Sequence, residues 1–213
     1  MEIVPTVLTG ERVKLVPMEI DHIDGLFAAA QDPRIWDYMF AKVETVDDMK
    51  RIVKEALSAK EIGLEFPFTV IDRTTDQIVG STRFLNIATA HRRLEIGWTW
   101  YHPSVWRTRV NTECKYLLLR HCFETLGAFR VEFKTDARNV RSRRAIERLG
   151  AVKEGILRKH RINQDGSNGD TVIYSIVLDE WESVKETRVR QFEAHFRQMK
   201  MPEMPLYQGF SGG

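Results

Sequence analysis

The chain has 213 residues, of which 43% are hydrophobic and 29% are charged, and its formal net charge is +2. This length fits one large domain, or one domain with an extension, and the hydrophobic content is ample for a folded core, which excludes a disordered chain. The net charge is too small to indicate a nucleic-acid partner from bulk electrostatics.

The first third of the chain predicts a strand followed by two helices. The strand lies within Val7 to Pro17, the first helix covers Asp21 to Ala30, and the second covers Thr45 to Lys60. Asp32-Pro33 ends the first helix. The short aromatic segment Ile35 to Phe40 is explained equally well by contact with the core and by a wall of a substrate site.

Three strands follow in succession. Phe66 to Asp72 and Ile78 to Ile87 flank a polar turn, and Leu94 to Tyr101 comes next, which predicts an antiparallel meander. The third strand has a period of two, which predicts one core face and one face available for chemistry. The two faces are Leu94, Ile96, Trp98 and Trp100 on one side, and Glu95, Gly97, Thr99 and Tyr101 on the other.

A loop and a helix start come directly after the third strand. The loop Ser104 to Val110 leads into a helix over residues 111–126, capped by Asn111 or Thr108 and ended by glycine. The first turn of a helix has backbone N–H groups without partners and a positive partial charge, so it readily binds a phosphate. Arg107 and Arg109 add full positive charges at this point.

The rest of the chain predicts a strand, a helix and two strands. The elements are Arg130 to Thr135, Val140 to Leu149, Ala151 to Arg161 and Thr171 to Leu178, with a glycine-rich turn between the last two. Between residues 130 and 161 the sequence has eleven Lys or Arg and four Asp or Glu. Such a basic face predicts an anionic ligand.

The last residues have a different pattern. Val189, Phe192, Phe196 and Met199 form a narrow apolar seam on a charged helix, which must pack either on its own domain or in a homodimer. Residues 208–213 are expected to fray. We therefore divide the chain into a domain over residues 1–178 and a helical extension with a frayed tail over residues 179–213.

The cysteines and the hydropathy predict a cytoplasmic protein without a membrane partner. Cys114 and Cys122 lie eight residues apart on one predicted helix, a separation of about 12 Å that no disulfide spans, so both are expected to be buried thiols. No apolar run reaches the ~20 residues of a membrane span, and none at the N-terminus has the length of a signal peptide.

Several spaced pieces of the chain resemble the Gcn5-related N-acetyltransferase (GNAT) family, especially its ribosomal-protein N-terminal acetyltransferase branch (RimJ/RimL-like). The pieces are residues 94–98, 106–113, 138–142, 145–151 and 154–158 with Asp170. The resemblance implies an α+β fold whose central sheet is mixed, mostly antiparallel, of about seven strands and flanked by helices. It also implies acetyl-CoA as the cofactor and an amine as the acceptor.

The resemblance implies a cofactor site around the end of the third strand, the following loop and the start of a later helix. The residues are Trp98, Trp100, Tyr101, Trp106, Arg107, Thr108, Arg109, Val110, Asn111, Thr112, Asn139, Ser142 and Arg143. The family's phosphate loop, Gln/Arg-x-x-Gly-x-Gly/Ala, has small residues where this chain has Arg109 and Asn111. Either the loop has another shape, or Arg109 pairs with phosphate, or it is a surface arginine without a ligand. For two other residues, the alternative to cofactor binding is a purely structural role: Asn139 as a helix cap and Arg143 as a solvated side chain.

The implied chemistry is direct transfer, in which a base takes a proton from the attacking amine. Glu95 is the candidate base, and the alternative is a structural carboxylate paired with Arg83 or Arg93. The family's tyrosine, which protonates the departing thiolate, is replaced by Ile146. Tyr101 and Tyr174 are then the candidate acids, and backbone N–H groups near Trp100 are expected to polarise the thioester oxygen.

The acceptor is less readable than the cofactor. The substrate-binding candidates are Trp36, Tyr38, Arg83, Glu95 and Tyr174, and the expected walls are residues 36–40 and 163–169. Neither wall is strongly acidic, which disfavours a polycation. No histidine spacing predicts a metal, and no DNA partner is expected. Two other functions stay open: coenzyme A binding without turnover, and ribosome or RNA binding by the basic face of residues 138–161.

Overall fold

The computed structural model describes residues 1–187, and the predicted seam from Val189 to Met199 lies outside that part. Eight strands form one sheet in the order β1-β2-β3-β4-β5-β6-β8-β7. The strands are β1 (Leu8–Thr9), β2 (Val13–Pro17), β3 (Phe66–Asp72), β4 (Gln77–Ala88), β5 (Arg93–Tyr101), β6 (Arg130–Asp136), β7 (Val152–Ile162) and β8 (Asn168–Val177). The mixed, mostly antiparallel α+β fold is confirmed, with eight strands where about seven were expected.

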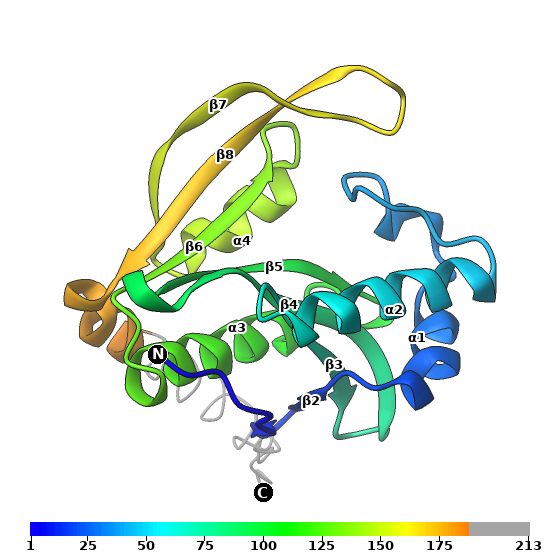
Figure 1. Cartoon of the computed structure of the whole chain (residues 1–213), viewed down its shortest axis with the longest axis horizontal. Helices are drawn as coiled ribbons and strands as arrows, with labels where there is room; N and C mark the ends of the chain where they lie inside the picture. The colour runs from blue at the N-terminus through cyan, green and yellow to red at the C-terminus, as the bar shows by residue number, and fades with distance from the viewer. Residues whose placement is uncertain (188–213) are drawn as a thin grey trace, which may run out of the picture.

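Helices cover both faces of this sheet (Figure 1). They are α1 (Ile23–Ala29), α2 (Val46–Glu61), α3 (Val110–Arg120), its π-helical continuation η5 (His121–Thr125) and α4 (Val140–Arg148). The buried residues of α1 and α2 form one core cluster with Trp36 and Trp100. Those of α3 and α4 belong to a second cluster on the opposite face. The predicted helices are confirmed, although α3 begins one residue earlier than expected.

The two faces of β5 are not those that the alternation predicts. Arg83 of β4 pairs with Gly97 and Ser81 with Trp100, so Trp98 and Thr99 together oppose one residue of β4. Trp98 has a φ of 49°. This β-bulge shifts the period by one residue. As a result Trp98 and Trp100 face α1 and α2, whereas Leu94 and Ile96 pack in the α3 cluster.

β5 and β6 are paired only at their beginnings. This parallel pair covers Arg93 with Arg130, Leu94 with Val131, and Glu95 with Glu132. Beyond these positions the strands diverge (Figure 1), and β6 continues beside β8. Among residues 1–187, the side of β5 that faces β6 therefore has no strand partner from residue 96 to residue 101. We call this divergence the splay.

The first residues after the proposed domain boundary pack on the domain. A helix covers residues 178–187, and its Trp181 and Val184 belong to the α3 cluster. The Trp181 ring lies 5.2 Å from that of Phe123, and its indole N–H donates to Glu124. Among residues 1–187, no helix combines the length and apolar character needed to cross a membrane.

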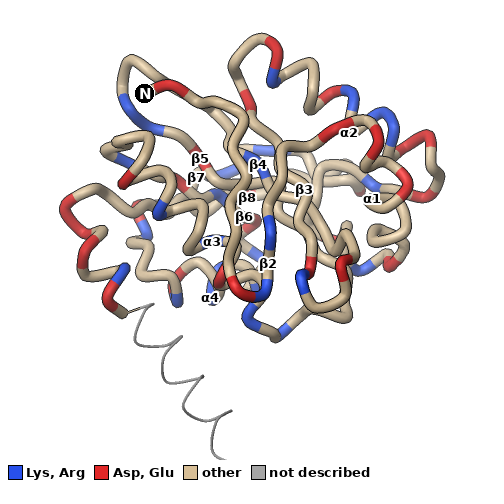
Figure 2. Tube along the Cα trace, turned by 90° about the horizontal axis from the view of Figure 1, so that it is seen from below, with Lys and Arg blue, Asp and Glu red and all other residues tan. Residues whose placement is uncertain are grey.

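Charges of both signs are interleaved along α2 (Figure 2). Its ion pairs are Lys50 with Asp47, and Arg51 with Asp48 and Glu55. The basic segment of residues 130–161 is also partly neutralised, because Arg130 pairs with Glu132 and Glu154, and Arg138 and Arg161 pair with Asp136. The local excess of positive charge is therefore less available to an external anion than the sequence alone suggests.

Candidate active site

Glu95 lies at the last paired position before β5 and β6 separate. Its Oε2 accepts hydrogen bonds from Asn86 Nδ2 and Lys134 Nζ, each at 2.8 Å. Its side chain is 8% exposed. The sequence suggested Arg83 or Arg93 as its partner, and this is wrong: Lys134, on the neighbouring strand, provides the cation.

Arg83 lies on the same face of the sheet as Glu95 but has other partners. Its Nη1 donates to Glu65 at 3.0 Å, and its guanidinium lies 4.3 Å from the ring centroid of Trp98. Burial lowers the pKa of Arg83, and the Glu65 carboxylate acts in the opposite direction. Arg83 and Trp98 thus contact each other on the α2 face of the sheet, where Trp98 packs against the α1 and α2 cluster.

In the loop before α3 the residue with a positive φ is Arg107, and not Arg109, which stands where the family has a glycine. Arg107 has a φ of 60°, whereas Arg109 is in the helical region with φ −72° and serves as the N-cap residue. Neither Asn111 nor Thr108 is the N-cap, although Thr108 Oγ1 accepts from the Val110 amide at 3.3 Å. A glycine at position 109 is therefore not required by the backbone.

Arg109 has an acidic neighbour within the chain. Its Nη1 lies 3.2 Å from Glu11 Oε2, in the turn between β1 and β2. That turn is fastened to α3 by Glu113, whose buried carboxylate accepts from the amides of Glu11 and Arg12. The loop therefore sits on a rigid support, and Arg109 is oriented by a carboxylate that an anionic ligand would have to compete with.

Donors for an anion remain at the start of α3. Within residues 1–187, the amides of Asn111 and Thr112 have no hydrogen-bond acceptor. Trp106 anchors the loop by donating from Nε1 to the Tyr101 carbonyl at 2.8 Å. Arg141 of α4 lies over the Trp106 ring at 4.2 Å. The site thus combines amide donors with arginines, a donor set that fits a pyrophosphate.

α4 brings in the remaining predicted cofactor residues. Asn139 is its N-cap, and Asn139 Oδ1 accepts from the Ser142 amide at 3.0 Å. Arg143 donates to the Ala137 carbonyl and to the Tyr174 hydroxyl. Arg143 is therefore folded back on its own domain, and Arg141 is the arginine of α4 that meets the loop.

Neither predicted tyrosine acid reaches the side of the sheet that holds Glu95. Tyr174 is buried in the α3 cluster, and its hydroxyl donates to Glu147 at 2.8 Å. Tyr101 is buried beside Cys114 in the same cluster, and its hydroxyl has no hydrogen-bond partner among the described residues. Burial raises the pKa of both phenols. The structure therefore corrects their expected roles in proton donation and substrate binding.

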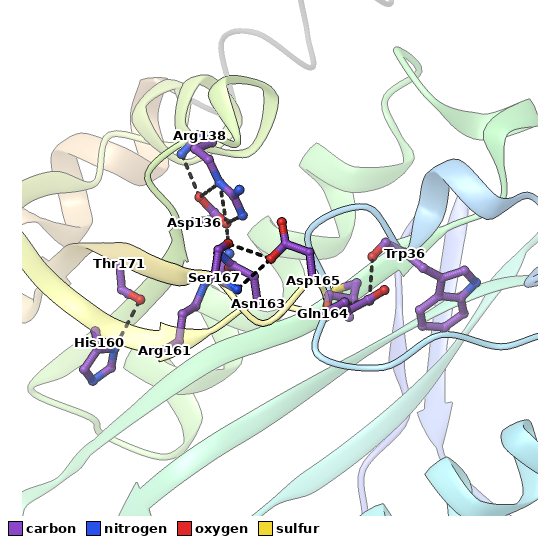
Figure 3. Close-up of polar contacts among 11 residues, drawn as sticks. Trp36, Asp136, Arg138, His160, Arg161, Asn163, Gln164, Asp165, Ser167 and Thr171 are labelled. Carbon is purple, nitrogen blue, oxygen red and sulfur yellow. Dashed lines mark hydrogen bonds and ion pairs between the residues drawn. The ribbon is translucent and has the colours of Figure 1, made fainter.

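The two expected substrate walls meet. Gln164, in the turn between β7 and β8, donates from Nε2 to the carbonyls of Trp36, Met39 and Ala41 at 3.2, 2.9 and 3.2 Å. Figure 3 shows this amide pointing at the Trp36 carbonyl. We call this contact the Gln164 bridge. It joins the β7–β8 turn to the segment before α2.

Two aromatic residues of the first wall, Trp36 and Tyr38, differ in how far they are buried. Trp36 is buried, its indole N–H donates to the Ala30 carbonyl, and its ring lies 5.5 Å from that of Trp100. Its side chain is thus a core contact, one of the two explanations left open above. Tyr38 is 36% exposed and stays available to a substrate.

Four residues of the structure were not singled out by the sequence: Lys115, Lys134, Arg141 and Gln164, the last of which lies within the expected wall of residues 163–169. Lys115 carried a signal, because Leu118 and Cys122 follow it by three and seven residues, and all three are buried on one face of the helix. A lysine on an apolar stripe needs an explanation. The other three depend on long-range contacts that no local pattern contains.

A model of the acetyltransferase (GNAT) domain matches residues 12–152. The chain belongs to the GNAT acetyltransferase family. The family assignment makes it an acyltransferase, and members of the family take their acyl group from acetyl-CoA.

Relatives cover nearly the whole described chain. An uncharacterized N-acetyltransferase of Bacillus licheniformis, p20, is 28% identical over 82% of this chain and 97% of its own. A solved GCN5-related N-acetyltransferase from Brucella melitensis is 28% identical, with a TM-score of 0.83 over 88% of this chain and 86% of its own. RimJ of Mycobacterium smegmatis, solved in complex with CoA-disulfide, has a TM-score of 0.76 over 89% of this chain and 95% of its own, but only 20% identity, so it supports the fold alone.

Proposed function

We propose that this GNAT enzyme moves an acetyl group from acetyl-CoA directly to a primary amine, either a protein N-terminus or a small amine. The observation that carries the proposal is the splay. Within residues 1–187, the edge of β5 that faces β6 has no strand partner from residue 96 to residue 101. This edge comes directly before a loop and a helix start at which the amides of Asn111 and Thr112 have no acceptor among the same residues. Extended ligands bind such strand edges through main-chain hydrogen bonds.

The chain's own residues fit the two ends of coenzyme A. The amides of Asn111 and Thr112, with the side chains of Arg107, Arg109 and Arg141, would hold the pyrophosphate. The unpaired edge of β5 and the start of α4 at Asn139 would hold the pantetheine arm. Acetyl-CoA, when bound, supplies an acetyl group activated as a thioester. Backbone N–H groups at the bulge can polarise the carbonyl oxygen of that thioester.

Glu95 is our candidate for the base. An amine attacks only when it is neutral, so a group near the thioester must take its proton, directly or through water. Glu95 lies where the strands separate, and its carboxylate is held by Asn86 and Lys134. This fixed orientation suits proton transfer, because a positioned carboxylate needs little reorganisation when the reaction begins.

The acceptor would approach between the two walls joined by the Gln164 bridge. Next to Tyr38 and Phe40 lies Arg161 of β7, whose guanidinium is 5.3 Å from the Phe40 ring centroid. Arg161 also pairs with Asp136. Such a rim favours a neutral or weakly charged acceptor with an apolar part over a polycation, because a polycation needs a cluster of unpaired carboxylates.

A thiol-release screen with acetyl-CoA against small amines and N-terminal peptides tests the proposal. We expect acceptor-dependent release of coenzyme A together with the acetylated amine in the mass spectrum. Binding of acetyl-CoA by calorimetry without turnover on any acceptor would support coenzyme A binding alone. The ribosomal N-terminal branch is favoured by the sequence pieces between residues 94 and 170, and acetylation of a ribosomal-protein N-terminal peptide in the same screen tests it.

A further inference from the structure

Lys115 is a buried cation that has no role in the reaction as described above. It projects from the second turn of α3 into the sheet and is 6% exposed. Its Nζ donates to Thr99 Oγ1 of β5 and lies 5.9 Å from the ring centroid of Phe133 in β6. Thr99 and Phe133 both come after Glu95 and Glu132, the last residues at which β5 and β6 pair with each other. The ammonium group therefore touches both strands at the point where they have already separated.

The local hydrogen bonding of Lys115 is incomplete. An ammonium group has three donors, and within residues 1–187 the only acceptor that Nζ finds is Thr99 Oγ1. That oxygen also shares a hydrogen bond with Thr82 Oγ1 at 2.8 Å. A buried cation with unused donors is costly unless a ligand completes its shell. Methionine or leucine would fill the same space without that cost, so stability alone does not explain a lysine here.

We propose that Lys115 is the general acid of the acetyl transfer, protonating the sulfur that departs from the acetyl group. This inference rests on the function proposed above. The amine nitrogen bonds to the acetyl carbon while the C–S bond breaks, and the electron pair of that bond stays on sulfur. A proton from Nζ goes to the sulfur, and the proton of the amine goes to Glu95 or to solvent. Solvent then reprotonates Lys115.

The proposal fills a gap that the sequence and the structure both leave. Position 146 is an isoleucine, which has no proton to give. The Tyr174 hydroxyl donates to Glu147 of α4, and burial raises the pKa of Tyr101 well above its usual value, which makes it a poor proton donor. Lys115 reaches the splay from α3, the helix whose start would hold the pyrophosphate. A ligand that lies along the free edge of β5 from that helix start toward Glu95 passes Thr99, to which Nζ donates.

The pKa of Lys115 is suitable for protonating a thiolate. Burial lowers the pKa of Lys115 to about 8, and the charges of Cys114 on α3 and Glu95 on β5 act in the opposite direction. A free thiol titrates near pH 8.5, so the proton passes between groups of similar basicity, the condition under which acid catalysis is efficient. Because the acid works only when protonated, its contribution falls as pH rises through the pKa of Lys115.

Two variants separate acid catalysis from a structural charge. Lys115→Met removes the proton, and Lys115→Arg keeps the positive charge and the donor to Thr99 but does not release a proton near neutral pH. We expect kcat to fall roughly 10²- to 10⁴-fold in both, with the high-pH limb of the wild-type profile lost. Arg120→Met, on the exposed side of α3, is the control and should keep wild-type kcat. Full activity in Lys115→Arg would show a structural role and overturn the proposal.

The leaving group gives a second test. Acetyl-seleno-coenzyme A releases a selenolate, which needs no proton because a selenol is a much stronger acid than a thiol. We therefore expect Lys115→Met to lose far less kcat with the seleno ester than with acetyl-CoA. Equal losses with both donors would contradict acid catalysis by Lys115.

A binding measurement tests the contact without turnover. By calorimetry, wild-type protein should bind coenzyme A more tightly than desulfo-coenzyme A, because Nζ contacts the sulfur, and Lys115→Met should bind the two equally. An unchanged preference in Lys115→Met, with an unchanged melting temperature, would overturn the inference while leaving the proposed function intact. A wild type that binds acetyl-CoA but acetylates no amine would overturn the proposed function and the acid role with it.

Discussion

At the scale of single residues, the arrangement around Glu95 separates the two proton transfers. Glu95 and Lys134 lie on the α2 side of the sheet, and Lys115 and Thr99 lie on the α3 side. An amine that arrives on the Glu95 side and a thiol that leaves beside Lys115 would use different groups. The proton acceptor for the amine and the proton donor for the sulfur are then separate groups, and each returns to its starting protonation state by exchange with solvent.

Replacing Glu95 by glutamine tests its role as the base. Glu95→Gln keeps the size of the side chain but removes its proton affinity, so we expect kcat to fall roughly 10²-fold or more. The dissociation constant of acetyl-CoA should stay within about twofold, because the carboxylate is not among the proposed cofactor contacts. Glu132→Gln, on the neighbouring strand, is the matched control. If Glu95→Gln lost cofactor binding and turnover together, Glu95 would be a structural carboxylate.

Arg109 and Glu11 form one ion pair, and replacing one or the other should change the affinity for coenzyme A in opposite directions. Arg109→Gly removes a charge-assisted contact to phosphate, worth about 1.5 to 3 kcal/mol, so coenzyme A affinity should fall roughly tenfold or more. Glu11→Gln removes the competing carboxylate and should raise affinity about twofold to fivefold, the range of an exposed ion pair. Calorimetry with coenzyme A and dephospho-coenzyme A, at low and high salt, measures both. Tighter binding of both ligands by Arg109→Gly would mean that Arg109 obstructs the loop.

At the scale of elements, the β-bulge in β5 shows where reasoning from periodicity fails. The alternation from Leu94 to Tyr101 has the period of two that a strand requires, but one extra residue at Trp98 and Thr99 inverts the second half. Neither residue is glycine, so no composition signal marks the positive φ of Trp98. Core contacts of Trp100 with Trp36 hold the inverted face in place.

At the same scale, the Gln164 bridge joins two segments, and substitutions of Gln164 test whether these segments contact the acceptor. One amide nitrogen of Gln164 serves three carbonyl oxygens. Gln164→Ala removes the link between the walls and should raise the KM of the acceptor severalfold with little change in that of acetyl-CoA. Gln164→Glu, which has the same shape, places a carboxylate against three carbonyls and should raise the KM of the acceptor further. A KM of the acceptor that is unchanged in both variants would mean that the walls do not contact the acceptor.

At the scale of the whole molecule, the sequence predicts the order of elements better than the site. The hairpin of β3 and β4, the glycine that follows η5 and the cap of α4 at Asn139 depend on residues close in the chain, and the structure confirms them. The Gln164 bridge and the Lys134–Glu95 pair join residues far apart in sequence. Such contacts follow from how the sheet twists and diverges, which composition and periodicity do not contain.

The stability of the whole fold should depend on one buried carboxylate at low pH. Asp72 ends β3, is 2% exposed and accepts two hydrogen bonds of 2.7 Å from Arg12 at the start of β2. Hydrogen bonds from Arg12, opposed by burial, lower the pKa of Asp72 to about 2. Since the pKa is depressed in the folded state, the pair stabilises the fold above the unfolded pKa near 3.9, and that stability is lost as pH falls toward 2.

Urea unfolding at pH 7 and at pH 2.5 tests this linkage. A shift of this size contributes about 2 kcal/mol to the free energy of unfolding at pH 7, so Asp72→Asn should lose at least that much there and lose less at pH 2.5. Asp47→Asn, in an exposed pair on α2, is the control and should change stability by under about 0.5 kcal/mol at either pH. An Asp72→Asn deficit that is equal at both pH values would mean that packing of the β2–β3 edge, and not the charge of Asp72, provides the stability.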